Sequence, residues 1–115
     1  MNREIKFRCW DQANKKMEYS ENPPSFGFWK YVSYDSDCLN TLMQFTGLHD
    51  KNGKPIYEGD IVKALDADGG DIAREIIFKD GGFLFFRQRG KLYNQKELTE
   101  KRIKEYKIEV IGNIY

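Results

Sequence analysis

The stretch Gln44–Lys63, QFTGLHDKNGKPIYEGDIVK, decides the fold because it combines two tight turns with the entry to an apolar strand. Asn52-Gly53 forms the first turn, since both residue types tolerate the positive φ that tight turns need. Glu58-Gly59-Asp60 then bends the chain into the apolar run Ile61–Leu65. The stretch therefore predicts short extended segments joined by glycine turns.

The composition of the chain favours a β-rich globular fold. Its 115 residues are 40% hydrophobic and 15% aromatic, and aromatic residues suit pleated, half-buried strands. The length allows one domain or two small lobes. Cys9 and Cys38 are too few for a disulfide framework and lack C-x-x-C spacing. We therefore expect reduced thiols in a soluble, cytoplasmic protein without a signal peptide or a membrane helix.

The first half of the chain predicts an N-terminal β segment over residues 1–55. Residues 5–9 alternate between apolar and basic side chains, which is the period of a half-buried strand. Residues 17–19 are expected to return as its hairpin partner. The aromatic-rich run 26–34 and the run 39–45 are predicted as two further strands.

Residues 56–115 predict a small barrel. Short apolar segments recur there at even spacing, and Lys79-Asp-Gly-Gly82 is a hairpin turn between two of them. Residues 95–104 are rich in Lys, Glu and Leu, so we expect one short helix. The strands predicted in this part and just before it cover residues 55–57, 61–65, 74–78, 83–87, 91–93 and 106–111.

Nucleophilic catalysis has little support in the sequence. His49 is the single histidine, and it follows the glycine of the central stretch in a turn. Cys9 or Cys38 could meet it in space, but no local pattern marks a nucleophile. The simpler interpretation makes each cysteine a small buried hydrophobe and His49 an exposed turn residue.

Acid–base chemistry and metal binding also have simpler alternatives. Glu58 and Asp60 form a carboxylate pair, but Asp60 beside a glycine turn is expected to accept hydrogen bonds from backbone N–H groups. The acidic loop 66–71 departs from the calcium-loop pattern and is expected to be solvated. We predict no enzyme activity, no metal and no cofactor.

Charge is distributed unevenly along the chain. The formal net charge is +1, but residues 31–82 sum to −5, residues 83–107 to +5 and residues 1–16 to +3. Either a basic face or neighbouring segments of opposite sign would produce this pattern.

The basic segment 83–107 supports an alternative function, nucleic-acid binding. Its aromatic residues could stack on bases while its cations meet phosphates. Alternatively, the aromatic residues belong to the core and the cations lie in water. The basic residues that would have to converge on one surface are Arg87, Arg89, Lys91, Lys101 and Arg102.

The string Phe45–Val62 resembles the YopX family, small proteins of bacteriophages and prophages in Gram-positive bacteria. Arg3–Asp11, followed by Lys16-Met17, resembles the family's opening, and Tyr106–Tyr115 resembles its closing segment. The resemblance implies a β-rich fold with an SH3-type barrel in the C-terminal portion. No catalytic residues can be carried over from it, because the family has none assigned. The motif residues expected to act as structural turn formers are Gly47, Asn52, Gly53, Gly59 and Asp60.

These observations predict a mainly β protein. We expect an N-terminal β layer packed on a C-terminal SH3-like small barrel of residues 56–115, with one short helix, as one compact unit. We expect a non-enzymatic phage or prophage accessory protein that binds a host or phage protein, or itself. Nucleic acid is the alternative partner, and neither a membrane nor a small-molecule substrate is expected.

Overall fold

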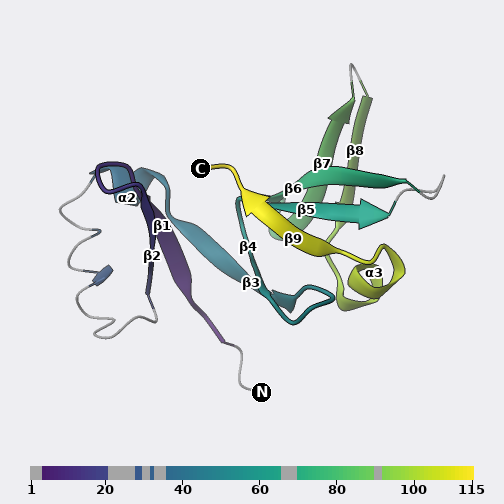
Figure 1. Ribbon diagram of the computed structural model, residues 1–115, viewed down its shortest axis with the longest axis horizontal. Coiled ribbons are helices and arrows are strands. Elements are labelled where there is room, and N and C mark those ends of the chain that lie inside the picture. The colour runs from purple at the N-terminus through teal and green to yellow at the C-terminus, as the bar shows by residue number, and fades with distance from the viewer. Residues whose placement is uncertain (1–3, 21–27, 30–31, 33–35, 66–69, 90–91) are drawn as a thin grey trace. The chain divides into compact units, whose positions relative to one another are not determined.

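The computed structural model is mainly β, and the residues that it describes form two antiparallel sheets and two short helices (Figure 1). It describes residues 4–20, 28–29, 32, 36–65, 70–89 and 92–115, with the backbone alone at 36–37, 71–72, 87–89 and 92–94. The chain divides into two compact units, residues 1–45 with Tyr115 and residues 46–114. Among the described residues, every helix is too short or too polar to cross a membrane. The predicted fold class is confirmed, although one helix was expected and the described residues include two, with further helical residues at 28–29 and 32.

In the first unit, β1 (Phe7–Asp11) is the central strand. It pairs antiparallel with β2 (Lys16–Tyr19) on one side and with the start of β3 (Met43–His49) on the other. The predicted hairpin of β1 and β2 is confirmed. Lys15 lies in its turn with a left-handed backbone, at φ 55°.

A disulfide between Cys9 and Cys38 joins β1 to α2 (Ser36–Asn40). Both cysteines are fully buried, in a cluster with Phe28 and Val32. The expectation of reduced thiols is wrong, because the fold brings the two Cα atoms to 5.0 Å, a usual separation for a disulfide, although 29 residues of sequence separate them.

The strand predicted over residues 26–34 is wrong where the structure describes that run. Phe28, Trp29 and Val32 are helical, and the other residues of the run lie outside the described ones. Phe28 and Val32 are buried, whereas Trp29 is 44% exposed. Spacing of four residues between two buried side chains is typical of one helix face.

The strand predicted over residues 39–45 starts later than expected. Leu39 and Asn40 end α2, and β3 begins only at Met43. Thr41 lies between them, and its Oγ1 accepts a hydrogen bond from the backbone N–H of Trp10 at 2.9 Å. A side-chain bond therefore fixes this helix-to-strand junction against β1.

Both tryptophans of the chain belong to the first unit. Trp10 lies on β1, and Trp29 packs edge-on against the rings of Phe7 and Phe28, with centroids 5.4 and 5.1 Å away. Edge-to-face packing at this separation is favourable for aromatic pairs. The aromatic run of the sequence therefore contributes to packing within this unit.

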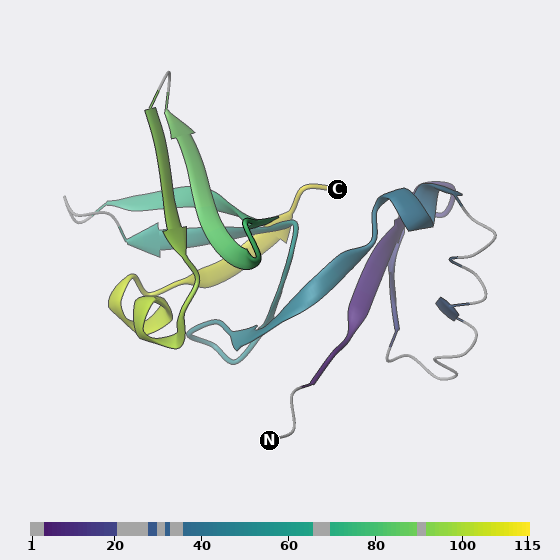
Figure 2. The same ribbon diagram turned by 180° about the vertical axis from the view of Figure 1, so that it is seen from behind.

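In the second unit, five strands form one antiparallel sheet in the order β8-β7-β6-β5-β9, which curls into a half-barrel (Figure 2). The last strand returns beside the first, where Val62 pairs with Val110. This half-barrel agrees with the SH3-like barrel expected from the sequence. The strands are β5 (Asp60–Leu65), β6 (Asp71–Lys79), β7 (Gly82–Arg89), β8 (Leu92–Glu97) and β9 (Glu109–Asn113), and β4 (Pro55–Tyr57) precedes them.

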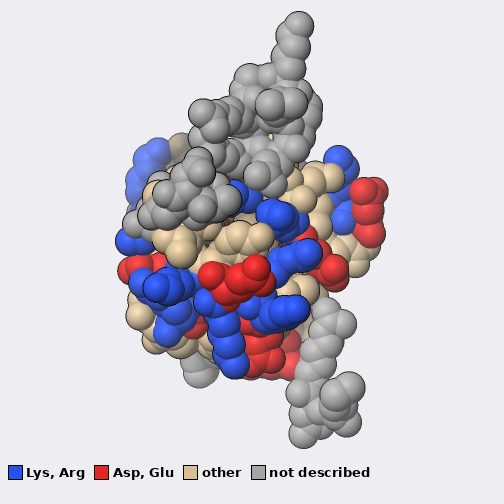
Figure 3. All heavy atoms as spheres, turned by 90° about the vertical axis from the view of Figure 1, so that its right-hand side faces the viewer, with Lys and Arg blue, Asp and Glu red and all other residues tan. Residues whose placement is uncertain are grey.

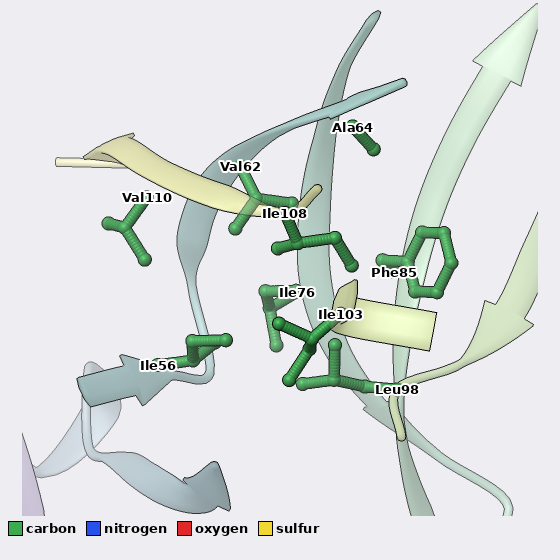
Figure 4. Close-up of a cluster of buried hydrophobic side chains, with 9 residues drawn as sticks. All are labelled: Ile56, Val62, Ala64, Ile76, Phe85, Leu98, Ile103, Ile108 and Val110. Atoms are coloured by element: carbon green, nitrogen blue, oxygen red, sulfur yellow. The ribbon is translucent and has the colours of Figure 1, made fainter. Parts of the chain in front are cut away.

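The core of the second unit gathers apolar side chains from the strands and from α3 (Glu100–Glu105) (Figure 4). Ile76 and Phe85 are cross-strand partners on β6 and β7, and both are fully buried. Such cross-strand pairs hold a sheet together on its inner face. The buried cluster consists of Ile56, Val62, Ala64, Ile76, Phe85, Leu98, Ile103, Ile108 and Val110.

The helix of the second unit starts five residues later than predicted. Residues 95–97 end β8 and pair with β7, although they are good helix formers, so sheet pairing overrides their local preference. α3 begins after Thr99, whose side-chain oxygen accepts a hydrogen bond from the backbone N–H of Arg102 at 3.1 Å. This hydroxyl is the N-cap of the helix.

Replacing Thr99 by alanine is expected to lower the free energy of unfolding by about 1 kcal/mol, because the helix loses its capping acceptor. Urea unfolding followed by far-UV circular dichroism measures the change. Thr99→Ser keeps the hydroxyl and is the matched control, so it should differ little from the wild type. Equal losses in the two variants would contradict the capping role.

Candidate interaction groove

Asp50 anchors the turn between β3 and β4 to the last strand. Its Oδ1 accepts hydrogen bonds from the backbone N–H groups of Asn52 and Lys54, at 2.8 and 2.9 Å. Its Oδ2 accepts one from the backbone N–H of Val110 at 2.8 Å, 60 residues away in sequence. Asp50 is only 5% exposed. One buried carboxylate therefore fixes the turn to β9, since each of its oxygens has a backbone partner.

The glycines of the central stretch hold left-handed backbone conformations. Gly47, Gly53 and Gly59 have φ values of 87°, 82° and 86°, where a side chain would be strained. Asp60 accepts a hydrogen bond at Oδ2 from the backbone N–H of Tyr57 at 2.8 Å. Gly53 and Gly59 lie in the turns on either side of β4, and Asp60 begins β5 directly after the second turn. Gly47 was expected in a turn but lies within β3.

A groove of about 460 Å³ lies between the turn and α3, which Figures 1 and 2 show side by side. Residues 47–51 form one wall, and Glu100, Ile103, Lys104 and Lys107 form the other. The backbone N–H of the turn residue 51 donates to the carbonyl of residue 108 at 2.9 Å, next to the second wall. The two walls are therefore fixed to each other by hydrogen bonds of the fold.

The floor of the groove is apolar and its rim is basic. Leu48 is half-buried and Ile103 is buried, and both contribute to the hydrophobic core of the second unit. Among the side chains that line the groove, three lysines accompany one exposed carboxylate, Glu100. The Asp50 carboxylate already accepts hydrogen bonds from three backbone N–H groups.

The lysines of the rim differ in their surroundings. Lys51 Nζ lies 3.3 Å from Glu109 Oε2, which also lies 3.6 Å from Lys63 Nζ. Lys104 and Lys107 are exposed, and neither forms an ion pair within the described part of the chain. These two cations of the rim are thus available for a negatively charged partner.

Four of the five predicted nucleic-acid-binding residues lie in the described part of the chain, and their backbones belong to two separate elements. Arg87 and Arg89 are on β7, paired with the first residues of β8. Lys101 and Arg102 are on α3, beyond the other end of β8, and Lys91 lies outside the described residues. The length of β8, roughly 20 Å of strand, lies between the two pairs.

Other features of the basic segment also reduce its fit to a nucleic acid. Phe85 is fully buried in the core and Arg102 Nη1 donates to the carbonyl of Glu97 at 3.0 Å. On the face of the molecule that includes α3, the basic atoms are interspersed with acidic ones (Figure 3). Nucleic-acid binding by this segment stays a prediction.

The candidate catalytic groups have structural partners. Cys9 and Cys38 are bonded to each other, so neither is a thiolate nucleophile in this state. Asp60 is 2% exposed, and its carboxylate accepts a hydrogen bond from a backbone N–H group. His49 is exposed at the groove as expected, but it ends β3 and does not lie in the turn that was predicted for it. Within the described residues, which exclude loop positions 66–69, no three potential metal ligands cluster.

The fold defines a small, mainly β protein with an SH3-like half-barrel as its second unit. The family model of the YopX protein matches residues 23–115, and the chain belongs to this family, as its central motif predicted. The crystal structure of protein EF1440 from Enterococcus faecalis is similar, with a TM-score of 0.59 and 22% identity over 98% of this chain and 94% of that chain. This identity supports a shared fold alone. No curated protein matches the chain.

Proposed function

We propose that the chain is a non-enzymatic protein-interaction module, an accessory protein of a bacteriophage or prophage, and that its partner docks in the groove between residues 47–51 and α3. The observation that carries this proposal is the fixed concave surface itself. The buried Asp50 carboxylate holds one wall, and the capped helix forms the other. Preorganised walls lower the cost of ordering on binding.

The chemistry of the groove favours a segment of protein over a small molecule. Small-molecule pockets bury most of their ligand and are predominantly apolar. Here His49, Lys51, Glu100, Lys104 and Lys107 are all exposed. An open groove with an apolar floor and a charged rim suits a peptide that offers side chains to both.

A photo-cross-linking experiment tests this function. A benzophenone amino acid in place of Lys104, inside the groove, is expected to cross-link a distinct protein in extracts of infected or lysogenic bacteria. The same amino acid in place of Lys101 is the matched control, because Lys101 is exposed on α3 but does not line the groove.

Strong cross-linking from position 104 and weak cross-linking from position 101 would support docking in the groove. A covalent dimer formed only from position 104 would identify a second copy of the chain as the partner. Equal yields at the two positions, or none at position 104, would contradict the proposed function.

A further inference from the structure

Lys107 occupies a backbone position at which glycine would be less strained. Its φ is 51°, and it directly follows Tyr106, the C-cap of α3. Helices commonly end on a glycine at this left-handed position, because a side chain there is disfavoured. The chain instead has a long cation there, and that cation lines the groove.

Folding alone gives a partial reason for this lysine. A positive charge at the end of a helix interacts favourably with the helix dipole. However, α3 has 6 residues and already carries Arg102 and Lys104 in its last turn. A further cation with a left-handed backbone therefore adds little to the helix and adds positive charge to the groove.

Lys104 and Lys107 are three residues apart and line the same wall of the groove. Beside them, the apolar floor of the groove consists of Ile103, which is 4% exposed, and the half-buried Leu48. The groove thus offers an apolar contact and two exposed ammonium groups within a short distance. Both features can be met by one extended peptide.

We infer that the groove binds an acidic segment of a protein partner. In this inference, which rests on the proposed function, an apolar side chain of the partner packs on Leu48 and Ile103. Carboxylates on the flanking residues of the segment pair with Lys104 and Lys107. Charge complementarity at a rim steers encounter and selects the partner, while the apolar contact supplies affinity.

A nucleic acid fits this groove less well than an acidic peptide. A phosphate backbone has no apolar side chain that could pack on Leu48 and Ile103. The acidic and basic side chains mix on the face near α3 (Figure 3), whereas backbone binding relies on many accumulated phosphate contacts. A short acidic peptide needs only the cations of the rim.

Selection from a random peptide library on the immobilised full chain tests the inference. We expect enriched peptides to contain one large apolar residue flanked by Asp or Glu. Their affinity, measured by fluorescence anisotropy, should fall about tenfold in Lys104→Gln/Lys107→Gln. Lys79→Gln/Lys101→Gln removes the same charge at exposed positions outside the groove, and its affinity should stay within about twofold of the wild type.

Lys107→Gly separates binding from folding. The melting temperature is expected to stay equal or to rise, because glycine relieves the left-handed backbone. The affinity for the selected peptides should nevertheless fall by about threefold. Lys15→Gly is the matched control, since Lys15 has a similar φ of 55° in a turn of the first unit. It should leave peptide affinity unchanged.

Three results would overturn the inference, and they differ in what they leave standing. Neutral or basic peptides that block cross-linking from position 104 would exclude an acidic partner but keep the proposed function. Absence of any peptide binder together with failed cross-linking would exclude both. Tight binding of single-stranded DNA that is lost in Lys104→Gln/Lys107→Gln, without any peptide binder, would assign the groove to nucleic acid.

Discussion

Replacing Asp50 by alanine is expected to lower the free energy of unfolding by about 3–5 kcal/mol, because three backbone N–H groups lose their acceptor. Each buried donor left without a partner costs about 1–3 kcal/mol. The N–H of Val110 is buried, so leaving it without an acceptor should cost the full free-energy penalty. The amides of Asn52 and Lys54 are partly accessible to water, so their cost should be smaller. The turn and β9 should then separate more easily.

Urea unfolding followed by far-UV circular dichroism measures this effect, and amide hydrogen exchange at Val110 locates it. Asp50→Asn is an intermediate variant, because its single carbonyl oxygen can serve the turn or Val110 but not both. We expect it to lose about half as much stability. Glu105→Ala is an exposed control that should change stability by less than about 0.5 kcal/mol. A loss below about 1 kcal/mol in Asp50→Ala would contradict the anchoring role.

Reducing the disulfide between Cys9 and Cys38 is expected to destabilise the first unit by about 3–4 kcal/mol, since the bond closes a loop of about 30 residues in the unfolded chain. The two cysteines are 29 positions apart and both are fully buried. The effect is measured as the difference between urea unfolding curves recorded with and without a reductant. Thiol titration of the denatured protein should find no free thiol before reduction and two afterwards.

The double variant Cys9→Ala/Cys38→Ala is the control for this prediction. It should unfold at the lower urea concentration of the reduced wild type and should not respond to the reductant. Coincident unfolding curves for oxidised and reduced wild-type protein would contradict the predicted contribution of the disulfide.

Strands of the second unit could be predicted from local sequence patterns where the pattern is typical of a strand or a hairpin turn and of no other element. Residues 61–65 alternate in burial, and the turn after Lys79 contains glycines where the hairpin needs them. Residues 95–97 were predicted as helix from their composition, but they form the end of β8, because pairing with β7 outweighs their helix preference. Thr99 marks the observed start of the helix, because its hydroxyl accepts a hydrogen bond from the backbone N–H of Arg102, three residues later.

The aromatic run of the first half shows where composition misleads. Phe28 and Val32 are four residues apart, a helical spacing visible in the sequence, but aromatic and β-branched residues favoured a strand. The period of burial would have been the better guide there. The disulfide had no local signal at all, because it depends on β1 and α2 meeting in three dimensions.

The groove could not be predicted for a similar reason. The turn at residues 50–54 was visible in the sequence, but its hydrogen bond to Val110 crosses 60 residues. Lys104 and Lys107 appeared as two of many lysines in a basic segment. Only the fold shows that they line the same concavity as Leu48. The left-handed backbone of Lys107 is likewise invisible in the sequence.

The location of both tryptophans in the first unit has a practical consequence for spectroscopy. Trp10 and Trp29 are the only indoles of the chain, so intrinsic indole emission reports on residues 1–45. Neither the strands of the half-barrel nor the lining of its groove contains a tryptophan. A ligand that fills the groove can therefore leave the emission spectrum unchanged, and a flat fluorescence titration would be uninformative about binding. A fluorescent label on the peptide reports binding at the half-barrel without relying on tryptophan.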